Sequence, residues 1–316
     1  MKPDVLDMFC GAGGSSAGAR AAGARVRGGI DGWDLAVRTF GDNFEGAALH
    51  HRTLTPGCVP GREFREGAYD MIIASPECTN HSPAKGSAPR CENSRLTSHY
   101  VLTFAESLKP RWIVLENVIQ LRTWNGFDTL IEGLRDQHYR IRIERLDASE
   151  FGVPQTRRRL FVICDRDRDV PVIPRSRKKA PPASSILRLD GKYECRPLYS
   201  ERRAIATLER AERAMAALGK KVPFLIVYYG SDGSGGWQSL DRPLRTLTTL
   251  DRFGLVTWEG SEPMLRMLQV EELKTAMGFP KSYSLRHGSR RDRIKMLGNG
   301  VCPPVMRAVV EALTST

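Results

Sequence analysis

Short apolar runs alternate with polar and glycine-rich segments along the first half of the chain. The apolar run at residues 5–9 leads into a glycine turn and an alanine-rich stretch, which predicts a strand, a tight turn and a helix. Further apolar runs predict buried strands at residues 26–30, 70–74 and 112–115. Because strands that alternate with helical segments favour a parallel sheet, we predict an α/β fold with ligands at the carboxyl ends of the strands.

The second half of the chain has a weaker pattern. Two more strands are predicted at residues 139–145 and 159–164, and the Pro-, Arg-, Lys- and Ser-rich segment that follows, from about 166 to 200, marks a boundary or an exposed segment. Residues 228–237 contain four glycines and predict a flexible loop. Apolar spacing predicts helices at 204–218, 264–277 and 304–313.

Charge adds a partner to this picture. Lys and Arg outnumber Asp and Glu by 48 to 36, which gives a formal charge of +12 over 316 residues. Such a balance favours a polyanion, with nucleic acid as the leading candidate, although a basic surface kept for solubility gives the same composition. No apolar run reaches the roughly 18 residues of a membrane span, and the first seven residues are too polar for a signal peptide, so we expect a cytoplasmic protein without membrane contacts.

The seven cysteines indicate neither a disulfide framework nor a metal site. They are scattered, odd in number and never spaced C-x-x-C. A functional cysteine must therefore be recognised by its position.

The first glycine turn is a candidate nucleoside site. Its pattern at residues 11–14 is Gly-x-Gly-Gly, and the third glycine of the pyrophosphate fingerprint is missing, which disfavours a nicotinamide dinucleotide. Asp31, at the end of the second predicted strand, could accept hydrogen bonds from ribose hydroxyls. The alternative is a turn that merely closes a strand–helix unit.

Cys78 is a candidate nucleophile. It lies in the loop directly after the strand at residues 70–74, and loops at strand ends carry function. A thiolate is a strong nucleophile once a nearby cation lowers its pKa, and His81 and Lys85 are possible cations. Considered alone, however, a cysteine is more often a small buried apolar residue, and both cations could simply face solvent.

Glu116 and two arginines are further candidates. Glu116 follows the strand at 112–115, where burial could keep a carboxyl partly protonated and able to donate to a base nitrogen. Arg157 and Arg159 alternate, so they share one side of an extended segment, and one could pair with the carboxylate while the other meets phosphate or base. The alternatives are a glutamate at a helix start and an arginine cluster that is only solvated or phosphate-binding.

Taken in order, these segments resemble the S-adenosylmethionine-dependent cytosine-C5 DNA methyltransferase family over nearly the whole chain. The matching motifs are Asp7-Met8-Phe9-Cys10-Gly11-Ala12-Gly13-Gly14, Pro76-Glu77-Cys78, Glu116-Asn117-Val118, Gln155-Thr156-Arg157-Arg158-Arg159, Arg242-Pro243-Leu244-Arg245-Thr246-Leu247-Thr248 and Gly298-Asn299-Gly300-Val301.

The resemblance implies a Rossmann-like methyltransferase domain with a smaller inserted target-recognition domain. It places the catalytic domain at residues 1–180, the recognition domain at 181–288, and a segment that completes the catalytic domain at 289–316. The implied cofactor is S-adenosyl-L-methionine and the implied partner is double-stranded DNA, bound by a monomer. The residues implied to bind the cofactor are Phe9, Cys10, Gly11, Ala12, Gly13, Gly14, Asp31, Pro76, Asn299 and Val301.

The resemblance also implies a mechanism on a cytosine turned out of the helix stack. Cys78 would attack C6 of the base. Glu116 would contact N3 and the amino group, and Arg159 would contact O2. Arg157, together with Gln155, would support the active-site loop, while Asn117 would hold the backbone.

The chain departs from the family pattern at three places. Cys78 is one residue further from Pro76 than in the usual Pro-Cys-Gln motif, and Gly300 stands where many relatives have serine. No acidic motif for adenine lies between Asp31 and Asp70. These departures leave open a modified alkyl donor, whose anionic group His81 and Lys85 could tolerate. Three rival functions also remain: an RNA cytosine methyltransferase, a silent DNA-binding relative, and a nicotinamide-dependent dehydrogenase.

Overall fold

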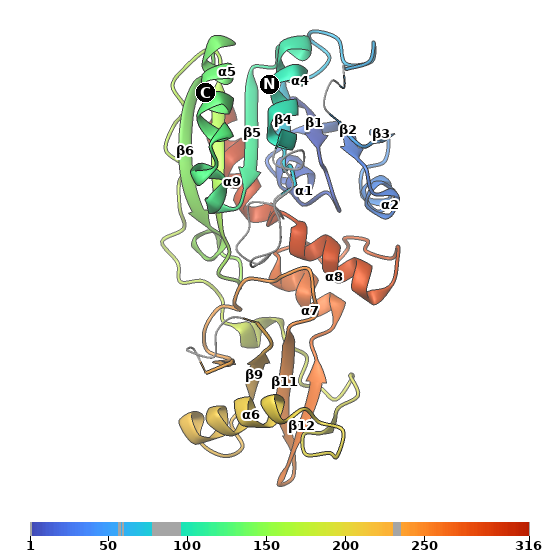
Figure 1. Ribbon diagram of the computed structural model, residues 1–316, viewed down its shortest axis with the longest axis vertical. Coiled ribbons are helices and arrows are strands. Elements are labelled where there is room, and N and C mark those ends of the chain that lie inside the picture. The colour runs from blue at the N-terminus through green and yellow to red at the C-terminus, as the bar shows by residue number, and fades with distance from the viewer. Residues whose placement is uncertain (1, 56–57, 59, 78–95, 230–234, 316) are drawn as a thin grey trace.

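The computed structural model describes residues 2–55, 58, 60–77, 96–229 and 235–315. Within these residues the chain forms a large sheet in one half of the molecule and a small sheet in the other (Figure 1). Cys78, His81 and Lys85 lie outside the described residues.

The large sheet has seven described strands in the order β3-β2-β1-β4-β5-β7-β6. The strands are β1 (Asp4–Met8), β2 (Arg25–Asp31), β3 (Ala48–His51), β4 (Met71–Ala74), β5 (Trp112–Asn117), β6 (Arg140–Asp147) and β7 (Arg158–Asp165). The first five strands are parallel, as predicted, but β7 runs antiparallel to both β5 and β6. The expectation of a parallel sheet is therefore wrong at this edge, because a short connection returns β6 directly into β7 as a hairpin.

Helices cover both faces of the large sheet. On one face α1 (Gly14–Ala21), α2 (Asp34–Asn43) and α9 (Pro303–Thr314) share an apolar core with the sheet. On the other face α4 (Tyr100–Leu108) and α5 (Gly126–Asp136) share a second core. The central strands β4 and β5 are buried along their whole length, which explains their continuous apolar runs.

The small sheet is antiparallel within the described residues. Its order is β10-β9-β11-β12-β8, formed by β8 (Arg196–Pro197), β9 (Phe224–Val227), β10 (Trp237–Ser239), β11 (Phe253–Glu259) and β12 (Glu262–Met267). The helix α6 (Ile205–Leu218) packs on it around a core of its own. Short 3-10 helices occur at Leu96–His99, Ile119–Thr123, Ala148–Phe151 and Ala183–Ile186.

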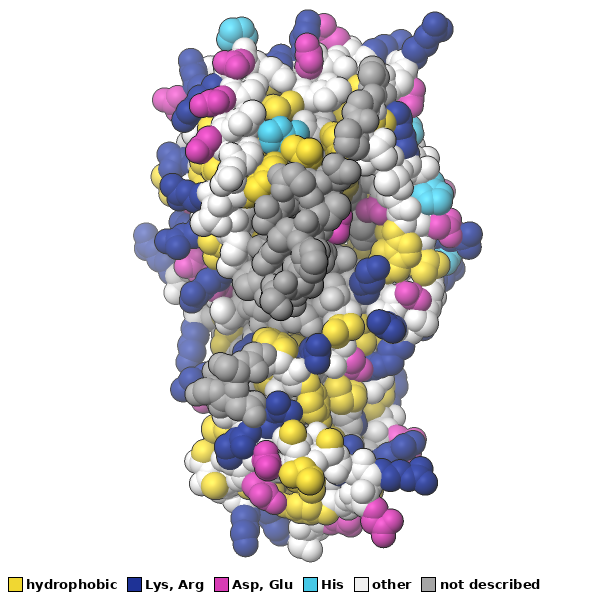
Figure 2. Space-filling model, viewed as in Figure 1, with side chains coloured by type: hydrophobic (Ala, Val, Ile, Leu, Met, Phe, Trp, Pro, Cys, Tyr) yellow, Lys and Arg dark blue, Asp and Glu magenta, His cyan; other side chains and the backbone are white. Residues whose placement is uncertain are grey.

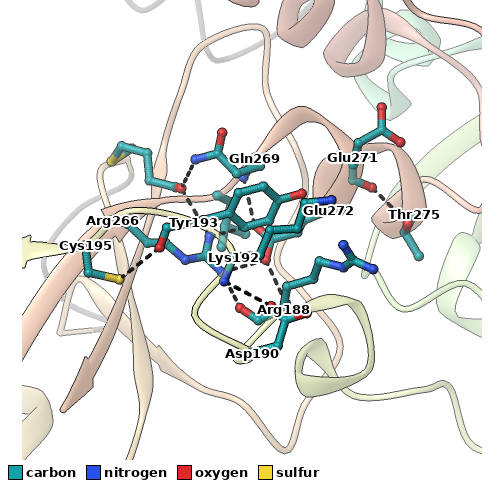
Figure 3. Close-up of polar contacts among 12 residues, drawn as sticks. Arg188, Asp190, Lys192, Tyr193, Cys195, Arg266, Gln269, Glu271, Glu272 and Thr275 are labelled. Atoms are coloured by element: carbon teal, nitrogen blue, oxygen red, sulfur yellow. Dashed lines mark hydrogen bonds and ion pairs between the residues drawn. The ribbon is translucent and has the colours of Figure 1, made fainter. Parts of the chain in front are cut away.

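The helix expected at residues 264–277 is wrong in its first part. Residues up to Met267 belong to β12, and the helix α7 (Val270–Ala276) begins only after a break. Arg266 of β12 is buried and forms an ion pair with Glu272 of α7, with an N–O distance of 2.7 Å. Tyr193 lies over the guanidinium at 5.1 Å, and Figure 3 shows these side chains together. The ion pair therefore links the strand to the first turn of the helix that follows it.

Two helices lie between the large sheet and the small sheet. The helix α7 packs against α8 (Arg290–Asn299), and both lie between the large sheet and the small sheet in Figure 1. The helix α9 then returns to the large sheet and packs on α1, so the end of the chain lies beside its beginning. Among the described residues, no helix is both long and apolar enough to cross a membrane.

Candidate active site

A cavity of about 420 Å³ opens at the carboxyl edge of the large sheet. Its walls come from the turn after β1, the end of β2, the segments after β4 and β5, and the last turn of α8. This is the edge at which open α/β sheets bind ligands. The volume is within the range of about 300–1,000 Å³ that small-molecule sites usually have.

The turn after β1 brings backbone to the cavity wall. Phe9 has a φ of 57°, a left-handed conformation that is rare for an aromatic residue, and its side chain lines the cavity. Gly14 must be glycine, because a Cβ there would lie 2.2 Å from the carbonyl oxygen of Val301. The turn is therefore pressed against the segment after α8, and the two together form one wall.

Asp31 fixes this turn rather than standing free. One carboxylate oxygen accepts the N–H of Gly11 at 2.8 Å, and the other accepts the N–H of Trp33 at 2.8 Å. Burial raises the pKa of Asp31, while these two hydrogen bonds oppose the rise. The carboxylate still lines the cavity, so its remaining lone pairs can accept a hydrogen bond from a hydroxyl group of a ligand.

Glu116 and Arg159 form the polar floor of the cavity. The Nε of Arg159 lies 3.1 Å from the Oε1 of Glu116, and both side chains line the cavity. The antiparallel direction of β7 creates this contact, because it places the start of that strand at the same edge as the end of β5. Burial raises the pKa of Glu116, and Arg159 only partly opposes the rise.

Arg157 is a structural clamp. Its guanidinium donates to the carbonyl oxygens of Leu247, Gly298 and Gly300 at 2.7–3.0 Å. It shares one side of the segment with Arg159, as predicted, since both line a small cavity behind Glu116. The expectation that one of the two arginines meets a phosphate or base is not met by Arg157, because both of its terminal nitrogens donate to backbone carbonyls.

Gln155 and Asn117 also hold backbone. Gln155 donates to the carbonyl of Ala276 and accepts the N–H of Leu247. The Asn117 amide donates to the carbonyl of Pro76 at 3.1 Å, as expected for a residue that supports the loop before Cys78. Ser75, Pro76 and Glu77 line the cavity, and the segment that continues from them to Cys78 lies outside the described residues.

Most of the residues expected at the cofactor site meet at this one cavity. The lining includes Phe9, Cys10, Gly11, Gly14, Asp31, Pro76, Asn299 and Val301. Ala12 and Gly13 lie one layer behind it. The carbonyl of Ala12 accepts the Tyr283 hydroxyl, and Gly13 is the N-cap of α1 with a φ of 81°.

Several lining residues were missed in the sequence. The indole of Trp33 and the ammonium of Lys295 lie 4.6 Å apart at the cavity, and Thr53 also contributes. Trp33 follows Asp31 by two residues, and Lys295 precedes Asn299 by one helical turn. For Lys295 the spacing was an available signal, since residues three or four apart share a helix face. For Trp33 the only signal was its closeness to Asp31 in the sequence.

The strand order with its antiparallel β7 and the ligand cavity at the carboxyl edge together define a Rossmann-like methyltransferase fold. Two solved structures share this fold. A DNMT2 variant from Spodoptera frugiperda is 17% identical and superposes with a TM-score of 0.71 over 99% of both chains. The S. pombe Dnmt2 methyltransferase, also 17% identical, gives 0.65 over 99% of this chain and 98% of that one.

The model of the C-5 cytosine-specific DNA methylase family matches residues 4–315, and the chain belongs to that family. The Type II methyltransferase M.SacI of Streptomyces achromogenes is 29% identical over 98% of this chain and 92% of its own. M.HindV of Haemophilus influenzae is 24% identical over 98% and 95%. M.HgiDI of Herpetosiphon aurantiacus is 28% identical over 77% and 80%. The predicted family, fold class and DNA cytosine-C5 methyltransferase activity are confirmed, and DNA is the implied substrate.

Proposed function

We propose that the protein transfers a methyl group from S-adenosylmethionine to C5 of a flipped-out cytosine through a covalent bond between Cys78 and C6. The observation that carries this proposal is the ion pair between the buried Glu116 and the partly exposed Arg159 on the floor of the cavity, beside the segment that leads to Cys78. A carboxyl whose pKa is raised by burial, together with a guanidinium, suits the ring nitrogen and the O2 of a cytosine.

The cavity also suits the proposed donor. Two aromatic rings, of Phe9 and Trp33, offer apolar contacts for adenine, and Asp31 and Thr53 offer acceptors and a hydroxyl for ribose. The backbone after Asn299 closes the other side. When bound, S-adenosylmethionine supplies an electrophilic methyl group.

The residues of the chain would activate the base. The Cys78 thiolate adds to C6 while Glu116 gives a proton or a hydrogen bond to N3, so that C5 becomes an enamine carbon and a nucleophile. Loss of the C5 proton and expulsion of the thiolate then restore the ring. Burial supports the role of Glu116, because its raised pKa keeps more of the carboxyl protonated near neutral pH.

The small sheet is proposed to recognise the DNA. We assign residues 181–288 to target recognition, and residues 1–180 with 289–316 to the catalytic domain, acting as a monomer. The net charge of +12 supports binding of a polyanion. Figure 2 shows Lys and Arg side chains on both halves of the visible face. The names of the Type II relatives support a role in restriction–modification.

The test is covalent trapping. In the presence of S-adenosylmethionine, we expect the protein to form an adduct, stable on a denaturing gel, with duplex DNA that carries 5-fluorocytosine. Once C5 is methylated, the fluorine that stands in place of the C5 proton blocks the final elimination. Cys78→Ala should abolish the adduct, and Cys195→Ala, which changes a half-buried cysteine of the small-sheet half, should leave it.

Other outcomes identify the alternatives. An adduct on tRNA but not on DNA would favour an RNA substrate, and no adduct on either would favour a silent DNA-binding protein. An adduct that persists in Cys78→Ala would refute the assignment of the nucleophile. Mass spectrometry of treated DNA is expected to show only 5-methylcytosine, and any other alkyl group would favour a modified donor.

A further inference from the structure

Asp7 is a buried carboxyl group that the proposed chemistry does not use. It lies in the middle of the large sheet, on β1, opposite Gly29 of β2 and Ile73 of β4. Its side chain has no exposed surface. The Ser16 hydroxyl donates to Oδ2 at 2.6 Å, whereas Oδ1 has no hydrogen-bond partner among the described residues. A carboxylate that is buried and only half satisfied is costly to keep charged.

Opposing effects set the charge of Asp7. Burial raises its pKa to about 7, and the neighbouring charge of Asp31 adds to the rise. Hydrogen bonds from the Ser16 hydroxyl and backbone, at the first turn of α1, oppose it. The charge of Asp7 also acts on Cys10 and Tyr283, and burial raises the pKa of both far enough to keep them neutral. Asp7 is therefore the group in this cluster that changes charge near neutral pH.

Asp7 lies directly behind the wall of the cavity. The residues that follow it, Phe9 to Gly11, line the cavity, and so do Gly14 and Ser15 at the start of the helix that Asp7 holds. Asp31, whose charge acts on Asp7, lines it as well. A buried charge is screened less by solvent and salt than an exposed one, so it acts more strongly on a charged ligand nearby.

We propose that Asp7 is a specificity determinant that makes the cavity favour the cationic methyl donor over the neutral product. The inference rests on the proposed use of S-adenosylmethionine. That donor carries a sulfonium, whereas S-adenosylhomocysteine carries an uncharged thioether, so the two ligands differ by one positive charge and one methyl group. A buried carboxylate behind the wall stabilises the first ligand and is indifferent to the charge of the second.

The direction of the pH effect follows from linkage. A cation in the cavity favours the ionised form of Asp7, so donor binding lowers the pKa of that group and releases a proton near pH 7. The donor is therefore bound more tightly as pH rises from 6 to 8. The neutral product leaves the pKa of Asp7 high, and its affinity stays flat over the same range. Methyl transfer thus removes the attraction that held the donor, which favours product release.

The test compares the affinities of the two ligands by calorimetry in the absence of DNA. For the native protein, we expect the ratio of product Kd to donor Kd to rise about threefold to fivefold between pH 6 and pH 8. Asp7→Asn should abolish this pH dependence, mainly by weakening donor binding. Ser16→Ala keeps the carboxyl but removes a hydrogen bond that lowers its pKa, so the rise should move to higher pH. Asp31 also titrates above its usual range, and the Asp7→Asn profile separates the two groups.

Three results would overturn the inference. A native ratio that does not change with pH contradicts it without any variant, so a folding defect in Asp7→Asn cannot obscure the outcome. Equal weakening of both ligands in a folded Asp7→Asn protein would reduce Asp7 to a structural role. If neither ligand binds the native protein at any pH, the proposed donor itself is wrong. That result is distinguishable from failure of the inference alone, in which both ligands bind but the ratio of their affinities does not change with pH.

Discussion

Two arginines separated by one residue serve different purposes in this protein. Arg159 faces Glu116 across the floor of the cavity, where a substrate group can reach both side chains. Arg157 is 3% exposed, and its two terminal nitrogens donate hydrogen bonds to three carbonyl oxygens. Removing that guanidinium would leave those carbonyls without a donor, so we regard Arg157 as a residue that positions the wall around Asn299 rather than one that touches substrate.

At the same scale, Glu116→Gln tests the proposed proton donor. A glutamine can still donate a hydrogen bond to N3 but cannot transfer a proton, so we expect adduct formation to slow by about 10²–10⁴-fold. Donor affinity should change little. The measurement is a time course of trapping on 5-fluorocytosine DNA.

The matched control for that prediction is Glu132→Gln. Glu132 is an exposed glutamate of α5 that does not line the cavity. Its replacement should leave the trapping rate nearly unchanged. Equal rates for the native protein and Glu116→Gln would exclude Glu116 from the chemistry.

At the scale of elements, the sequence predicts what depends on local pattern. The buried strands β1, β4 and β5 follow from their apolar runs, and α6 and α9 from apolar spacing. The sequence also indicates that the glycine turn follows the first strand, that Glu116 lies near the end of a strand, and that Arg159 lies at the start of another. These features depend on neighbours in the chain, which a single sequence displays.

What the sequence misses depends on contacts between distant residues. Met264 and Leu268 are four residues apart, as are Leu273 and Met277, which resembles the spacing of a helix. Pairing of residues 262–267 with β11 nevertheless makes the first part a strand. The residues around Arg266 in the sequence do not indicate that its side chain is buried or that it pairs with Glu272. The direction of β7 and the approach of Lys295 to Trp33 are likewise set by packing, which overrides local preference.

The contact between α1 and the segment after α8 yields a prediction at this scale. Gly14→Ala would place a methyl group against the Val301 carbonyl, an atom of backbone that cannot turn away. We expect a loss of stability of about 1–3 kcal/mol and a weaker response of the melting temperature to donor. The measurement is thermal unfolding with and without S-adenosylmethionine.

Gly133→Ala is the control for this substitution. Gly133 lies inside α5, where a new Cβ would meet only the end of the flexible Leu102 side chain. Its melting temperature should be unchanged or slightly higher, because alanine favours a helix. If Gly14→Ala behaved like this control, the segments after β1 and α8 would not be in close contact.

At the scale of the whole molecule, the net positive charge is the property that bears most on DNA binding. A net charge of +12 predicts that DNA binding depends strongly on ionic strength, since each neutralised phosphate releases counterions. We expect the Kd for duplex DNA to rise at least about tenfold between 50 and 200 mM salt, the effect of as few as two phosphate contacts. Filter binding at several salt concentrations measures it.

Donor binding provides the contrast, because a single small ligand displaces few ions. Its Kd should change much less over the same salt range. If the Kd for duplex DNA did not change with salt concentration, the positive charge would serve solubility instead of DNA binding.

The cavity combines residues that are far apart in the sequence. Phe9, Gly14 and Asp31 form one side, and Asn299 and Val301 form the other, with α9 packed on α1 to hold them together. A ribosome therefore makes the first wall long before the second. A nascent chain that has not yet reached Val301 has no complete pocket for the donor.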